Sequence, residues 1–117
     1  MEKIDLIATL AALAQDNRLD VFRLLVQAGP DGLPAGRVAE ALGLAPNTLT
    51  FHFDRLRNAG LVTVRREGRS MIYTARFDTM RGLVKYLTEN CCTGVSPGCA
   101  APKRKAASPR IRIKEQA

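Results

Sequence analysis

The chain has 117 residues, 46% of them hydrophobic and 25% charged, which is the composition of one soluble globular domain rather than of a multidomain enzyme. Its formal net charge of +7 favours a polyanionic partner. The apolar runs are far shorter than the ~20 residues that a membrane span needs. Glu2 and Asp5 stand where a secretory signal would be basic, so we expect a cytoplasmic protein without a membrane partner.

Two helices are expected at the start of the chain. Apolar periodicity predicts the first over residues 4–14, with a stripe wide enough to be covered on more than one side. Asp16 or Asn17 is the expected N-cap of the second, which ends at Ala28 before a Gly-Pro pair. The residues expected to face inward from the second helix are Leu19, Phe22, Leu25 and Val26.

The next two helices have the spacing of a helix-turn-helix. The first is predicted over Ala35–Leu42, with Gly43 just past its end. The second opens at Pro46 and stops at Gly60. Its inward residues at helical spacing are Leu49, Phe53 and Leu56. Two short helices joined by about four residues, the second with one apolar and one polar face, are typical of this motif.

A β-hairpin and a last helix complete the predicted domain. Residues 61–66 and 70–75 are rich in β-branched side chains and flank Gly68, whose freedom to adopt positive φ suits a hairpin tip. Thr79–Glu89 is the expected last helix, and its apolar seam is Met80, Leu83, Val84 and Leu87. The fold class is therefore mainly α with a β-hairpin wing, a winged helix-turn-helix. Roughly 90 ordered residues would be marginal alone, so we expect a homodimer formed through the first and last helices.

The positive charge lies in two places. Residues 51–76 hold six basic against two acidic residues, +4, and residues 100–117 hold six against one, +5. We expect residues 1–90 to form the DNA-binding and dimerisation domain, 91–99 a cysteine-bearing metalloid-binding loop, and 100–117 a basic, disordered tail. The tail can add non-specific attraction to DNA, whereas the +4 falls on the predicted recognition helix and wing.

The candidate DNA contacts follow from that placement. They are Asn47, Thr48, Thr50, Phe51, His52, Arg55, Arg65, Arg66 and Arg69. Asn can pair with adenine, Thr and Phe can meet a thymine methyl, and a wing arginine can enter a narrow minor groove. An ordinary polar helix face and solvated surface arginines are the alternatives. For His52, contact with a phosphate and a neutral place at the core edge both stay open.

Three cysteines carry the second candidate site. Cys91, Cys92 and Cys99 can bring three thiolates round one soft ion, whereas the vicinal pair would form a strained disulfide. No fourth zinc ligand lies nearby, and the single histidine excludes two-histidine zinc motifs. Three thiolates suit As(III) or Sb(III), and nothing indicates an organic cofactor. Incidental cysteines and a redox switch stay open. A thiol enzyme such as an arsenate reductase is disfavoured, because the cysteines lack an anion-binding cradle.

The recognition-helix region resembles the ArsR/SmtB family of metalloregulatory repressors. The resemblance rests on Thr48-x-Thr50-x-His52-Phe53, on residues 59–62, on 65–69 and on Asp16-x-Arg18, and it covers about residues 4–90. It implies a homodimeric winged helix that binds a palindromic operator and leaves it when metal binds.

The metal site departs from the family's best-known patterns. Residues 33–44 lack the Cys-x-Cys pair of common arsenic sensors, and the last helix lacks the histidines of zinc sensors. The cysteine arrangement instead resembles members that sense As(III) just after the last helix. We therefore expect an arsenite- and antimonite-responsive repressor, with a redox-sensing repressor or a sensor of Cd(II) or Bi(III) as alternatives.

Overall fold

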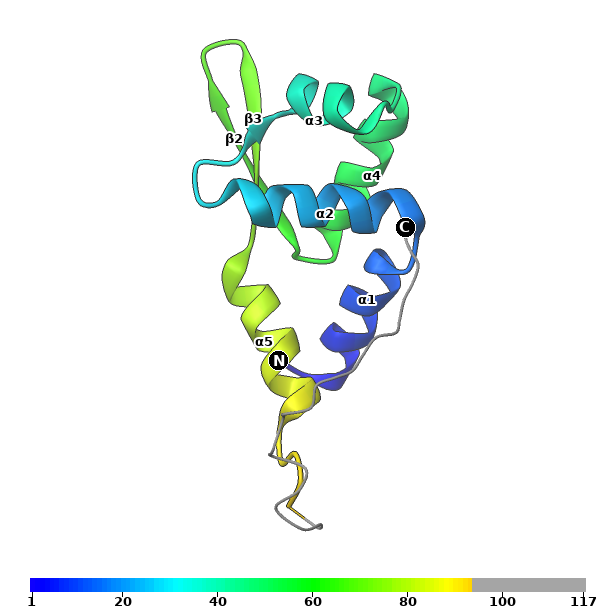
Figure 1. Cartoon of the computed structure of the whole chain (residues 1–117), viewed down its shortest axis with the longest axis vertical. Coiled ribbons are helices and arrows are strands. Elements are labelled where there is room, and N and C mark those ends of the chain that lie inside the picture. The colour runs from blue at the N-terminus through cyan, green and yellow to red at the C-terminus, as the bar shows by residue number, and fades with distance from the viewer. Residues whose placement is uncertain (94–117) are drawn as a thin grey trace, which may run out of the picture. The chain divides into compact units, whose positions relative to one another are not determined.

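A computed structural model describes residues 1–93, which fall into two units that divide between Leu87 and Thr88. The helices are α1 (Lys3–Leu13), α2 (Asp16–Ala28), α3 (Ala35–Leu42), α4 (Pro46–Asn58) and α5 (Phe77–Thr88). The strands are β1 (Leu33–Pro34), β2 (Val62–Glu67) and β3 (Ser70–Ala75). The element order is that of a winged helix-turn-helix, as expected, with α3 and the hairpin tip on one side of α2, α1 and α5 on the other, and α4 crossing α2 (Figure 1).

The start of α2 differs from the prediction. Gln15, in extended conformation, is the N-cap, and its side-chain oxygen accepts a hydrogen bond of 2.9 Å from the Arg18 amide. Asp16 already lies in the first turn, where its negative charge suits the positive end of the helix dipole. The predicted cap at Asp16 or Asn17 was therefore wrong.

The buried face of α2 is also rotated from the prediction. Leu19 was expected inside but is 43% exposed, whereas Val21 is fully buried beside Phe22 and Leu25. Leu19 lies on the rim of an apolar groove with Leu13 and Met80 rather than in the core.

The helix-turn-helix itself follows the prediction closely. α3 has the predicted bounds, and Gly43 closes it in the left-handed conformation at φ 65°. Pro46 occupies the first turn of α4, and the three inward residues of that helix are at most 2% exposed. These helices begin and end as expected because proline and glycine act locally on the backbone.

The sheet contains a strand that the sequence pattern did not predict. The strand order is β1-β3-β2, with antiparallel pairs such as Leu33 with Tyr73 and Val64 with Tyr73. Gly32, at φ 71°, precedes β1, and a Cβ there would collide with the Tyr73 carbonyl oxygen and the Thr74 hydroxyl. Glycine therefore lets the chain pass close over β3 and turn the hairpin into a three-stranded sheet.

One core joins α2, α3, α4 and the hairpin. Its fully buried members include Val21, Leu25, Val38, Leu56 and Leu61. Phe53 of α4 stacks on Tyr73 of β3, with ring centroids 3.6 Å apart and planes 2° from parallel. The recognition helix is thus fixed to the wing by an aromatic pair as well as by aliphatic packing.

The outer helices bury much less. α1 contacts α2 and α4, and its buried residues are Leu6 and Thr9, whose hydroxyl donates to the Asp5 carbonyl oxygen at 2.8 Å. α5 begins at Phe77, two residues before the predicted start, and only Leu83 in it is buried. Large apolar side chains stay exposed on both helices: Ile4 73%, Ile7 57%, Val84 55% and Leu87 60%. Among residues 1–93, no helix is long and apolar enough to cross a membrane.

Candidate nucleic-acid interface

The outer face of α4 presents the predicted recognition row. Asn47, Thr48, Thr50 and Phe51 are all exposed, whereas Leu49 and Phe53 anchor the opposite face in the core. Ala45, the N-cap residue, offers no side-chain cap, so the first N–H groups of α4 remain available to a phosphate. A firmly packed helix with a polar outer N-terminal half has the form of a major-groove reader.

The roles of Thr50 and Phe51 are limited by their neighbours. The Thr50 hydroxyl donates to the Pro46 carbonyl oxygen at 2.9 Å, so its O–H is already used within the helix. Phe51 is half exposed, and the Arg55 guanidinium lies 5.0 Å above its ring. The pair forms one apolar and cationic surface, since a guanidinium is attracted to the face of an aromatic ring.

His52 lies inside the protein, not on this surface. Its ring is 5% exposed, and its Nδ1 lies 3.4 Å from Nη1 of Arg18 on α2. Burial, and then the positive charge of Arg18, lower the pKa of His52 below its ordinary value of 6.5. These surroundings favour the neutral core-edge alternative for His52, although its contact is with α2 rather than with the hairpin.

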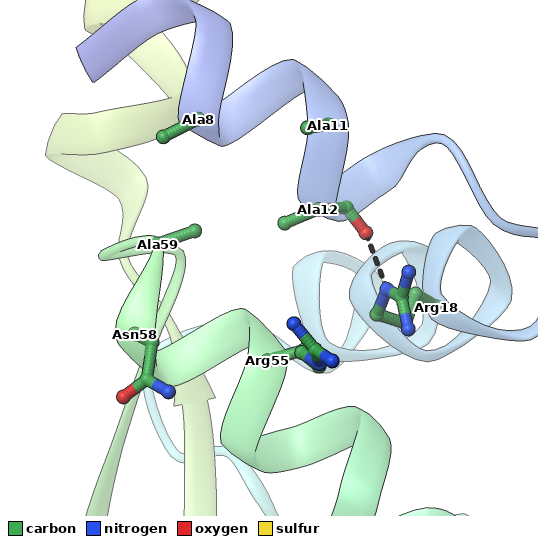
Figure 2. Close-up of a pocket in the computed structure, with 7 residues that line it drawn as sticks. All are labelled: Ala8, Ala11, Ala12, Arg18, Arg55, Asn58 and Ala59. Carbon is green, nitrogen blue, oxygen red and sulfur yellow. Dashed lines mark hydrogen bonds between the residues drawn. The ribbon is translucent and has the colours of Figure 1, made fainter. Parts of the chain in front are cut away.

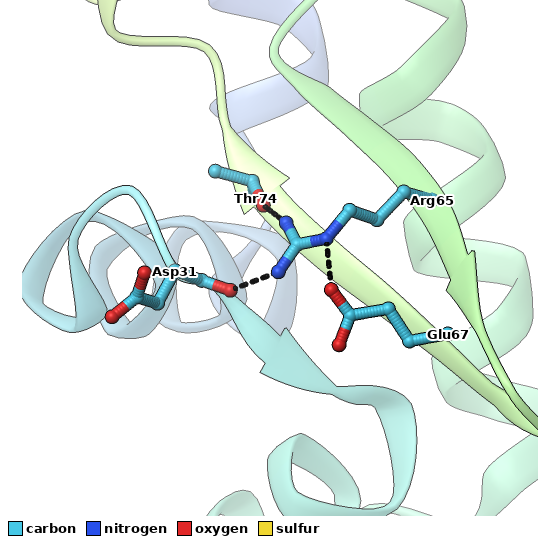
Figure 3. Close-up of polar contacts among 4 residues, drawn as sticks. All are labelled: Asp31, Arg65, Glu67 and Thr74. Atoms are coloured by element: carbon cyan, nitrogen blue, oxygen red, sulfur yellow. Dashed lines mark hydrogen bonds and ion pairs between the residues drawn. The ribbon is translucent and has the colours of Figure 1, made fainter.

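The wing arginines differ in their contacts. Arg65 donates from Nε to the Glu67 carboxylate at 2.8 Å, from Nη2 to the Asp31 carbonyl oxygen at 2.8 Å and from Nη1 to the Thr74 hydroxyl at 3.3 Å (Figure 3). It ties the wing to the loop before β1. Each of its three nitrogens makes a hydrogen bond within the protein, so its first role is to position the wing.

Arg66 and Arg69 leave more charge for a partner. Arg66 donates from Nε to the Gly68 carbonyl oxygen at 3.3 Å, a contact within the hairpin tip itself. Arg69 is exposed at the tip, and its side chain has no hydrogen bond or ion pair with any residue from 1 to 93. Arg69 is therefore the wing residue that is most ready to reach a DNA groove.

The cysteine site is described only in part. Cys91 is exposed, and its Sγ lies 3.3 Å from Sγ of Cys92, which is disulfide-bonded. Asn90 and Cys92 adopt positive φ, 60° and 65°, a conformation that L-residues rarely take. Cys99 lies outside the described residues, as do residues 100–117. The three-thiolate site and the predicted division at residues 90 and 99 therefore stay predictions.

Sequence reasoning missed the residues that hold the interface in place. Arg18 and the Arg65 network are built from groups that meet only in the folded chain, and no local pattern marks their partners. For Thr9, the signal was present, because its position on the buried face of α1 matches helical spacing from Leu6.

Comparison with known proteins agrees with this geometry. A family model described as a helix-turn-helix domain matches residues 13–65. An uncharacterized HTH-type transcriptional regulator of Bacillus subtilis, YceK, is 34% identical over 70 residues, 60% of this chain and 69% of that protein. The Mycobacterium tuberculosis regulator NmtR is 40% identical over 72 residues, 62% of this chain and 57% of NmtR.

A solved structure extends the likeness to three dimensions. Mb0332 from Mycobacterium bovis, described as a homodimeric winged helix-turn-helix DNA-binding domain of a possible ArsR-family regulator, superposes with a TM-score of 0.60 at 28% identity. The match covers 74% of this chain and 80% of that one. The relatives are transcriptional regulators rather than enzymes. The chain belongs to the helix-turn-helix transcriptional regulators of the ArsR/SmtB-like winged-helix type.

Proposed function

We propose that this regulator is a homodimeric repressor that binds a palindromic operator and releases it when As(III) or Sb(III) binds Cys91, Cys92 and Cys99. The observation that carries the proposal is the pairing of an exposed polar face on α4 and exposed wing arginines with soft sulfur donors that follow α5 in the sequence. Asn47, Thr48, Thr50 and Phe51 would read bases, and Arg66 and Arg69 would meet phosphates or the minor groove.

The exposed apolar faces support the homodimer. α1 and α5 leave Ile4, Ile7, Val84 and Leu87 more than half exposed, which is unusual for large aliphatic side chains of a stable monomer. A second copy placed on these faces would bury them and would set the spacing of the two α4 helices. Half-sites must lie about one helical turn of DNA apart for both helices to bind.

The donor geometry fits a soft ion. Two sulfurs on one ion with bonds of about 2.3 Å can be at most about 4.6 Å apart, and Cys91 and Cys92 are 3.3 Å apart at Sγ. Three thiols and As(OH)3 would give one As(SR)3 group and three waters, so that no redox partner is needed. Cys92 must first be reduced, because a disulfide sulfur is not a thiolate donor.

A redox-sensing repressor is the second candidate, because the sulfur atoms of the exposed Cys91 and of Cys92 lie 3.3 Å apart. In that function, two thiols would lose two protons and two electrons to a peroxide, which would be reduced to two waters. The exposed Cys91 thiol beside Cys92 would be accessible to the oxidant.

Electrophoretic mobility shift on an operator selected from random duplex DNA separates the two functions. The fully reduced protein is titrated with arsenite in one arm and with hydrogen peroxide in the other. The proposal expects release by arsenite in wild type and none in a Cys91→Ser, Cys92→Ser, Cys99→Ser variant that still binds the operator. Release by peroxide alone, with a new disulfide seen by mass spectrometry, would assign the redox function instead.

A further inference from the structure

A cavity between α1, α2 and α4 is a candidate for a second ligand site. Its volume is about 320 Å³, near the lower end of the ~300–1,000 Å³ typical of small-molecule pockets. Figure 2 shows alanine side chains of α1 on one side and the guanidinium groups of Arg18 and Arg55 on the other, with Asn58 at the edge and its amide turned away from them. The alanines are Ala8, Ala11 and Ala12.

The charges in this cavity are unbalanced. The ion pairs within residues 1–93 are Arg65 with Glu67 and Arg76 with Asp78, so neither Arg18 nor Arg55 has a carboxylate partner there. Arg18 instead donates from Nε to the Ala12 carbonyl oxygen at 2.7 Å and approaches the buried His52 ring. Arg55 lies over the Phe51 ring. Two cations with only neutral partners in one cavity repel each other, and an anion between them would remove that cost.

The surroundings select the kind of anion. A guanidinium binds a carboxylate through two parallel N–H groups. The alanine methyls offer no polar partner to the remaining oxygens of an inorganic phosphate, but they fit a short hydrocarbon chain. We propose that this cavity binds a small organic carboxylate with a short apolar body.

The cavity and the candidate DNA-reading surface share the helix α4. Arg55 and Asn58 belong to α4, the helix that carries Asn47 and Thr48, and Arg18 touches His52 of the same helix. A carboxylate there would link α1 and α2 to α4 and bias the orientation of the recognition helix. This regulation involves neither the cysteines nor a metalloid, so it stands apart from the function proposed above.

Methyl and amide NMR titration of the full chain, without DNA or metalloid, tests the site. Sodium butyrate is the probe, and sodium chloride and sodium phosphate at matched ionic strength are the other arms. We expect saturable shifts centred on Ala8, Ala11 and Ala12 in the butyrate arm, with a dissociation constant on the order of 1 mM for so small a ligand.

Matched variants make the result specific. Arg55→Gln is expected to weaken butyrate binding about tenfold or more, whereas Arg57→Gln, an exposed position of the same helix outside the cavity, leaves it unchanged. Ala11→Leu keeps both arginines and the helix but fills the apolar side, so it is expected to abolish saturation.

Three results would overturn the proposal. One is the absence of saturable butyrate shifts in the folded wild type. Another is equal weakening by Arg57→Gln, which would mean non-specific attraction to positive charge. The last is phosphate binding as tight as that of butyrate and insensitive to Ala11→Leu, which would assign an inorganic anion site. None of these three results would count for or against arsenite release from the operator, which is tested separately.

Discussion

The helix-turn-helix with its wing and the two outer helices are stabilised differently. In the first region, α2, α3, α4 and the hairpin share a core whose largest members are at most 6% exposed. In the second, α1 and α5 keep most of their large aliphatic side chains in solvent. The candidate DNA-reading surface is therefore held by a core within one chain, whereas the outer helices leave apolar side chains exposed that the proposed homodimer would bury.

The largest expected effect is in the shared core. Phe53→Ala removes the ring that stacks on Tyr73 and leaves a cavity between α4 and β3. It is expected to lower the free energy of unfolding by about 3 to 5 kcal/mol, as measured by urea denaturation. A loss below about 1 kcal/mol would show that α4 is not held by this core.

A charge on an outer helix should affect association rather than folding. Leu87→Glu is expected to raise the dimer dissociation constant at least tenfold, about 1.4 kcal/mol, in analytical ultracentrifugation, with little change in helix content. Thr63→Glu, which adds the same charge to an exposed position of β2, is the control. Equal dimerisation of wild type and Leu87→Glu would contradict the interface on α5.

Arg65 and Arg69 of the wing are expected to have different roles, Arg65 in stability and Arg69 in DNA binding. Arg65→Gln breaks the network with Asp31, Glu67 and Thr74, so it should lower the free energy of unfolding by about 0.5 to 1.5 kcal/mol. Because these groups are exposed to solvent, we expect a loss toward the lower end of that range. Arg69→Gln should leave the urea midpoint unchanged and reduce the salt dependence of operator binding by about one unit of slope. The reverse pattern would mean that the roles of the two residues are exchanged.

The smallest effect is a pH dependence from His52. Its pKa in the folded state is lowered below 6.5, mainly by burial and further by Arg18, so the unfolded chain takes up a proton first as the pH falls. Stability is therefore full above pH 6.5 and declines below it. Urea midpoints at pH 7.5 and 5.5 should differ less in His52→Gln than in wild type. Because His52 is the only histidine, an identical pH dependence in both would rule out this account.

The parts of the fold that depend on local signals were predicted well. Gly43, Pro46 and Gly68 place α3, α4 and the hairpin tip, because each acts on its own stretch of backbone. β1 was missed, since two residues gain strand geometry only by pairing with β3. Leu19 was expected inside and is exposed, because a helix with apolar residues on several faces does not fix which face the rest of the fold will cover.

The candidate site was predictable in its outline only. Residue type and helical phase were enough to place Asn47, Thr48, Thr50 and Phe51 on the outer face of α4. Residue type and helical phase did not show that His52 is buried between α2 and α4 or that Arg65 is bound to the loop before β1. Both distinctions depend on residues more than 30 positions away in the chain.

Fluorescence anisotropy of labelled operator tests the central claim most directly. The fully reduced protein at equilibrium with operator is titrated with arsenite, alongside the triple Cys→Ser variant at positions 91, 92 and 99. We predict that arsenite lowers the operator affinity of wild type by about 5- to 150-fold, the usual range of allosteric coupling, and leaves the variant unchanged. An unchanged wild-type affinity under arsenite, or equal release of the variant, would contradict arsenite sensing through these cysteines.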